Sequence, residues 1–167
     1  RVREELGVRF DYTPSKDLAG KLADATDLVV FCHGWQNSTV STREFCSKLI
    51  KGVQSMAGED RAGLAYLAVS WNSERLIFHE SALAAEVIGE TRLAPLLASL
   101  RSAHPTLKIT LVGHSLGARM VLATLQESPG KGAESAVLLE GAVNRDALVP
   151  GREAGFGSFP GASTHAD

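Results

Sequence analysis

The sequence of 167 residues lacks the features that mark several classes of protein. Its two cysteines cannot build a disulfide framework, and no residues show the spacing of a zinc ligand set. The 17 basic and 19 acidic side chains give a formal net charge of −2 and are scattered along the chain, so there is no electrostatic sign of binding to nucleic acid or anionic membranes. The apolar runs, such as Leu28 to Cys32, are far too short to span a bilayer.

The composition itself is that of a globular domain. Hydrophobic residues make up 44% and charged residues 22% of the chain, which excludes wholesale disorder. One domain is expected over 1–167, with a core at 27–146 and a glycine-rich tail at 150–167. The chain begins at Arg1 and shows no signal-peptide pattern, so we expect a cytoplasmic protein and an incomplete sequence.

Short apolar runs alternate with longer helical patterns along the chain. This alternation is typical of βα units that build a parallel sheet. After Asp27, the run at 27–32 is apolar without alternation, as expected for a strand covered on both faces. Further strands are expected at 63–69, 108–112 and 136–139, and a short one at 7–10. The pattern predicts an α/β fold with a mostly parallel sheet and helices on both faces.

Three helices are expected between these strands. The first begins at a capping box formed by Ser41 and Glu44. The others are expected at 81–102, with a kink or restart at Pro95, and at 116–127. The side chains that the first helix is expected to bury are Phe45, Leu49, Ile50 and Val53.

A Gly-x-Ser-x-Gly motif occupies 113–117, between an expected strand and an expected helix. A serine on such a sharp turn has a strained backbone, and Gly113 and Gly117 would leave room for the turn. The strain lifts the hydroxyl of Ser115 above the sheet and places the helix N-terminus beneath a developing oxyanion. We therefore predict that Ser115 is a nucleophile; the alternative is a glycine-rich turn that only packs.

A second element follows the first strand, at His33, Gly34 and Trp35. An oxyanion hole needs two backbone donors, one of which is the N–H of the residue after the nucleophile, Leu116. Gly34 would let the loop approach the site, so that Trp35 or Gln36 supplies the second N–H. We expect His33 to be a buried histidine that is hydrogen-bonded to backbone, rather than an acid–base catalyst.

The segments at 31–35 and 113–117 resemble an α/β-hydrolase, the superfamily of esterases, lipases, peptidases and acyltransferases. More narrowly, the chain is similar to a bacterial α/β-hydrolase family of unknown function. That family has Trp-Pro-Ser or a close variant after the next strand, and here 71–73 reads Trp-Asn-Ser, without the proline. The resemblance covers about 27–146 and implies a three-layer α/β-hydrolase-type sandwich. It also implies that the strands lie in the order 63–69, 28–32, 108–112 and 136–139.

A nucleophilic serine needs a base and an acid, which follow it in the chain in α/β-hydrolases. Only His165 follows Ser115 as a candidate base, and it lies in the glycine-rich tail. Asp146 is the candidate acid, with Glu140 as an alternative to it. His114, beside the serine, is expected to pack rather than to act as a base. We interpret the chain as the N-terminal portion of a longer hydrolase.

The sequence therefore predicts a serine hydrolase that acts on carboxylic esters through an acyl-enzyme on Ser115. A non-catalytic binding module with the same fold and an acyltransferase that uses the same serine are the alternatives. The acyl-enzyme mechanism needs no metal or organic cofactor. The expected partner is a small-molecule ester or acyl substrate. The strand at 136–139 is also expected to offer an edge for self-association.

Overall fold

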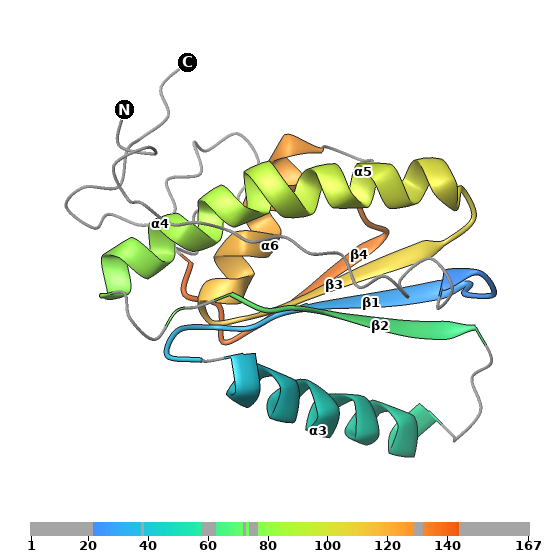
Figure 1. The fold of residues 1–167 in the computed structure, drawn as a ribbon, viewed down its shortest axis with the longest axis horizontal. Helices are drawn as coiled ribbons and strands as arrows, with labels where there is room; N and C mark the ends of the chain where they lie inside the picture. The colour runs from blue at the N-terminus through green and yellow to red at the C-terminus, as the bar shows by residue number, and fades with distance from the viewer. Residues whose placement is uncertain are drawn as a thin grey trace.

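A computed structural model describes residues 22–37, 39–57, 63–71, 73, 77–128 and 132–143 of the chain (Figure 1). The expected short strand at 7–10 lies outside the described residues, as does the glycine-rich tail at 150–167.

The described strands form one parallel four-stranded sheet. They are β1 (Asp27–Cys32), β2 (Leu64–Val69), β3 (Lys108–His114) and β4 (Ser135–Leu139). Their order across the sheet is β2-β1-β3-β4, which confirms the predicted arrangement. Because β1 and β3 are central and parallel, their carboxyl ends meet at one edge of the sheet, where ligand sites of open α/β sheets lie.

Helices cover both faces of this sheet, as predicted (Figure 1). Helix α3 (Thr39–Ala57) lies on one face. The other face carries α6 (Leu116–Glu127) and a long helical stretch made of α4 (Phe78–Ile88), the π-helical segment η1 (Gly89–Leu93) and α5 (Ala94–Ala103). The architecture is a three-layer α/β sandwich. Within the described part of the chain, no helix combines the length and the hydrophobicity needed to cross a membrane.

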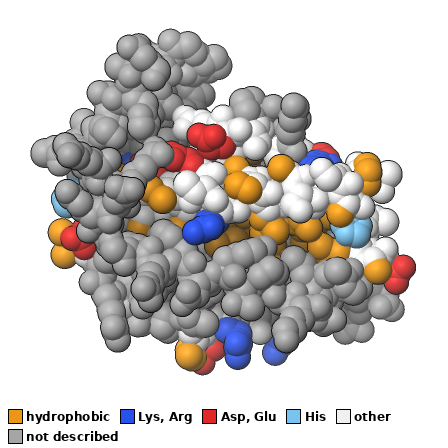
Figure 2. All heavy atoms as spheres, turned by 45° about the horizontal axis from the view of Figure 1, so that its top comes forward, with side chains coloured by type: hydrophobic (Ala, Val, Ile, Leu, Met, Phe, Trp, Pro, Cys, Tyr) orange, Lys and Arg blue, Asp and Glu red, His pale blue; other side chains and the backbone are white. Residues whose placement is uncertain are grey.

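The core lies between the sheet and the layer of α4, α5 and α6. Alternate residues of β1 and β3 point into it, in keeping with the two-residue period of a strand. Figure 2 shows apolar side chains in a band along the described part of this side of the molecule, with charged side chains scattered around it. The most deeply buried apolar side chains include Leu28, Val30, Leu97, Ile109, Leu111, Met120 and Val121.

Two expectations for the first helix are wrong. Helix α3 begins at Thr39, so Ser41 lies inside its first turn rather than capping it. Phe45 is 42% exposed, whereas Thr42 and Cys46 are buried against the sheet. Leu49, Ile50 and Val53 lie half-buried on the same side of α3 as Thr42 and Cys46, so only Phe45 departs from the expected stripe. Phe45 lies at its margin, where its ring stacks on Phe31 with the ring centroids 5.3 Å apart.

The expected interruption at Pro95 takes the form of the π-helical segment η1 just before it. Helix α5 restarts with Pro95 in its first turn, and the N–H of Ala94 donates to the carbonyl of Gly89. That carbonyl also accepts a hydrogen bond from Thr124 Oγ1 of α6 at 3.2 Å. A Cβ added to Gly89 would lie 2.3 Å from Met120 O, so only glycine allows the two helices to approach this closely.

The close approach of Gly89 to helix α6 leads to a prediction about stability. Alanine favours helices over glycine, yet Gly89→Ala should lower the free energy of unfolding by about 1–3 kcal/mol because its methyl group overlaps the backbone of α6. Gly52→Ala in α3 is the matched control, since nothing lies within 4 Å of its added Cβ. The free energy of unfolding of that variant should rise by about 0.5–1 kcal/mol. Urea unfolding of both variants measures the difference, and a stabilised Gly89→Ala protein would contradict the close crossing.

Candidate active site

Ser115 occupies the sharp turn between β3 and α6. Its backbone has φ 53° and ψ −117°, a conformation that residues with side chains seldom adopt. Its N–H donates to Leu139 O at 3.0 Å, and its carbonyl accepts from the N–H groups of Ala118 at 3.0 Å and Ala142 at 3.1 Å. Three backbone hydrogen bonds therefore hold the strained residue in place.

The two flanking glycines are required because the backbone is crowded on both sides of the turn. A Cβ at Gly117 would lie 2.0 Å from Cys32 O at the end of β1. A Cβ at Gly113 would lie 2.6 Å from Gly117 O and 2.7 Å from the backbone of Ala118. The motif thus allows α6 to start directly against β1 and β3, as the predicted turn requires.

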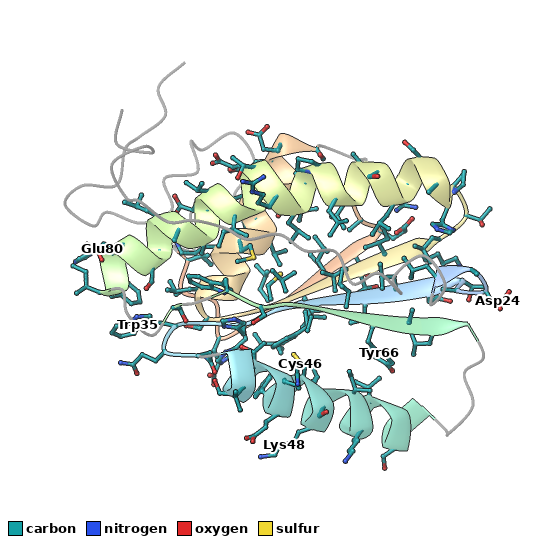
Figure 3. The ribbon with its side chains drawn as sticks, viewed as in Figure 1. Asp24, Trp35, Cys46, Lys48, Tyr66 and Glu80 are labelled. Carbon is teal, nitrogen blue, oxygen red and sulfur yellow. The ribbon has the colours of Figure 1, made fainter. Side chains whose placement is uncertain are left out.

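The loop after β1 lies directly against Ser115. A Cβ on Gly34 would be 2.8 Å from Ser115 Cβ and 3.1 Å from His114 O, so a side chain at this position would displace the serine. Gln36, further along the loop, has a φ of 57°. Figure 3 shows Trp35 at the same end of the molecule as Glu80, near the start of α4, whereas Asp24 lies at the opposite end. The Trp35 ring meets the Phe78 ring edge to face at 5.5 Å.

Polar groups converge on the carbonyl oxygen of Gly34. His33 Nδ1 lies 2.8 Å from it, Ser73 Oγ 3.2 Å and Asn37 Nδ2 3.3 Å. Asn37 Nδ2 also donates to Trp35 O at 2.9 Å. This network fixes the orientation of the peptide group between Gly34 and Trp35.

His33 is buried and held by backbone groups, as expected. Its Nε2 accepts from the N–H of Trp71 at 3.1 Å, so Nδ1 carries the proton that is donated to Gly34 O. Trp71 Nε1 donates to His33 O at 3.2 Å, and the two rings stack with centroids 5.5 Å apart. Burial lowers the pKa of His33, and the two backbone hydrogen bonds offset this only in part. The ring is therefore neutral and serves the architecture of the loop.

Sequence reasoning missed the contributions of Ser73 and Asn37. Ser73 is fully buried, and besides its contact with Gly34 its Oγ accepts from the N–H of Asn37 at 3.1 Å. The hydroxyl thereby joins the segment after β2 to the loop after β1. The Trp-Asn-Ser stretch at 71–73 could have indicated the role of Ser73, because this stretch follows β2, whose carboxyl end lies next to that of β1.

His114 lies on the sheet face that carries α3. Its ring stacks on Phe45 with centroids 6.0 Å apart, and its Nε2 lies 3.7 Å from a carboxylate oxygen of Glu140. Glu140 has a φ of 45° and an exposed side chain. His114 thus has the packing contact expected of it, together with an acidic neighbour. Asp146 and His165, the candidate acid and base, lie outside the described residues.

Leu116 is the first residue of α6, so its N–H belongs to the helix N-terminus beside Ser115 and has no carbonyl partner within the helix. Its side chain is fully buried. Among the residues that the structure describes, no three His, Cys, Asp or Glu side chains are grouped so that they could hold a metal ion.

The lowered pKa of His33 makes stability depend on pH. The unfolded chain takes up a proton near the ordinary pKa of 6.5, whereas the buried folded ring resists protonation. The free energy of unfolding should therefore be highest above about pH 7 and fall as the pH is lowered through 6.5, by up to about 1.4 kcal/mol for each unit of pKa shift. Urea unfolding across this range should show a smaller fall for His33→Gln. Equal falls in both proteins would contradict this role of His33.

A comparison with known protein families identifies one whose sequence pattern the chain shares. The sequence pattern of the family described as "Alpha/beta hydrolase of unknown function (DUF900)" matches residues 14–140. No protein of curated function matches the chain. The resemblance of residues 27–146 to an α/β-hydrolase family is thereby confirmed for the family and for the fold.

An acetylxylan esterase and a phospholipase are among the solved structures that match the chain. An acetylxylan esterase is similar with a TM-score of 0.51 and 18% sequence identity, over 72% of this chain and 66% of the esterase. Phospholipase PlaB from Legionella pneumophila has a TM-score of 0.43 and 17% identity, over 70% of this chain and 25% of the phospholipase. At this identity the esterase supports the fold alone, and this chain spans just under two thirds of its length.

Proposed function

Because the chain belongs to this α/β-hydrolase family, we propose that it carries the nucleophile and the oxyanion hole of a serine hydrolase acting on carboxylic esters. The observation that carries the proposal is the backbone of Ser115, with its φ of 53°. Strain of this kind persists only where the surroundings enforce it, and it is common at active sites. A turn that merely joined a strand to a helix would not need it.

The oxyanion hole is proposed to consist of the N–H groups of Trp35 and Leu116. In a trans peptide the N–H points opposite to the C=O, and no described peptide bond is cis. The groups gathered around Gly34 O therefore direct the Trp35 N–H to the other side of the loop. Donors fixed before the substrate arrives need no reorganisation as charge develops, which makes them effective in catalysis.

The proposed reaction proceeds in two steps. Ser115 Oγ attacks the ester carbonyl, its proton passes to a base, and the tetrahedral oxyanion is held by the two N–H groups. Collapse expels the alcohol, which takes the proton back, and water then hydrolyses the acyl-serine. We keep Asp146 as the proposed acid and His165 as the proposed base.

Fluorophosphonate labelling and ester turnover in the full-length protein test this proposal. Ser115→Ala should abolish labelling and lower kcat for p-nitrophenyl acetate by about 10³-fold or more, because a nucleophile has no substitute in an acyl-enzyme mechanism. Ser102→Ala is the matched control, since Ser102 lies in α5 and its hydroxyl bonds to Ala98 O. A protein that never labels would be a non-catalytic binding module. Transfer of the acyl group to an added alcohol in preference to water would identify an acyltransferase.

Strand β4, at one edge of the described sheet, leads to a second proposal, which concerns self-association. In the described sheet β4 is an edge strand, and Val137 and Leu139 are 44% and 38% exposed. Apolar edge strands are templates for pairing with another chain. We propose that two copies meet through this strand around a twofold axis.

Light scattering across a concentration series of the 167-residue chain should show dimers or larger species. Val137→Lys should reduce association, because a charge on the edge disfavours pairing. Val40→Lys is the matched control: Val40 is 68% exposed on α3, away from the edge, so association should persist. Monomers at every concentration would refute the proposal.

A further inference from the structure

Arg119 is a buried cation one turn into α6, just after Ser115. Its side chain is 3% exposed, and its guanidinium joins two other parts of the fold. Nε and Nη2 donate to one carboxylate oxygen of Glu86 in α4, at 2.9 Å and 2.5 Å. Nη1 donates to the carbonyl of Ala142, beyond the end of β4, at 3.3 Å. One side chain thus connects α6, α4 and the segment that follows β4.

The segment at 139–142 is also the one that holds Ser115. Leu139 O accepts the N–H of Ser115, and the N–H of Ala142 donates to the carbonyl of Ser115. A Cβ on Gly141 would lie 3.1 Å from Ala118 Cβ, so the segment packs closely on the first turn of α6. Ala142 is therefore held from both sides, by Ser115 through its N–H and by Arg119 through its carbonyl.

We propose that Arg119 is a positioning residue for the nucleophile, an inference that rests on the proposed role of Ser115. It fixes the segment at 139–142, and that segment fixes both backbone groups of the strained serine. Guanidinium suits this task because its planar group of five donors can serve two acceptors in fixed directions. Glu86 supplies the opposite charge that a buried cation requires, and it anchors the guanidinium to α4.

The role of a positioning residue differs from that of a stabilising ion pair. A buried ion pair can often be replaced by apolar side chains of similar size without loss of stability. If Arg119 acted only through stability, such a replacement would leave turnover intact. If it positions the nucleophile, the replacement keeps the fold and the binding of substrate but slows the chemical step.

The test is the double variant Glu86→Leu with Arg119→Met in the full-length protein. We expect hydrogen exchange at the amides of 139–142 to become at least about tenfold faster, because exchange follows local opening. For p-nitrophenyl acetate, kcat should fall by about 10-fold to 100-fold while KM stays within about twofold. Thr124→Val is the matched control, since Thr124 links α6 to Gly89 without touching 139–142. It should keep both the exchange rate and kcat.

Arg119→Lys is the second variant and keeps a cation beside Glu86. A lysine has one donor group in place of a planar fork, so kcat should lie between the wild type and the double variant. A folded double variant with unchanged exchange or unchanged kcat would overturn the inference. Turnover that survives Ser115→Ala would instead overturn the proposed function. Exchange at 139–142 would then still decide whether Arg119 holds the segment.

Discussion

Three backbone segments meet around Ser115 with almost no space between them, and the remaining geometry of the site depends on this contact. The end of β1 reaches within 2.0 Å of where a Cβ of Gly117 would be, and Gly34 leaves room for Ser115 itself. The segment after β4 completes the contact through two hydrogen bonds to the serine backbone. Such crowding allows only one backbone path, so the strain at Ser115 cannot relax by a local shift.

Polar groups around this contact are arranged to hold one peptide group in one orientation. His33 can donate to Gly34 O and accept from Trp71 N only while it is neutral, and burial favours that state. Ser73 adds a link from the neighbouring segment. The loop after β1 is thus fixed by the side chains that meet at Gly34 O. The proposed oxyanion hole would rely on preorganisation of this kind.

The sequence allowed the sheet order and the turn at 113–117 to be predicted, because continuous apolar runs and a strand–motif–helix context are local signals. Within the stripe predicted for α3 only Phe45 was misplaced, since it occupies the margin by stacking on Phe31. The burial of Arg119 could not be predicted from the sequence, because a single arginine in an amphipathic helix is ordinarily exposed. Its burial depends on Glu86, 33 residues away in the chain. Contacts over such separations follow from the packing of helices and cannot be read from a local pattern.

The register of the parallel sheet explains why these distant residues meet. Cys32 pairs with Gly113 in the β1–β3 ladder, and His114 pairs with Leu139 in the β3–β4 ladder. The three strands therefore end at the same level, and each following segment begins beside Ser115. A shift of one residue in either ladder would turn every side chain of that strand to the opposite face. The buried apolar residues of β1 and β3 oppose such a shift, so the hydrophobic core also determines the position of Ser115.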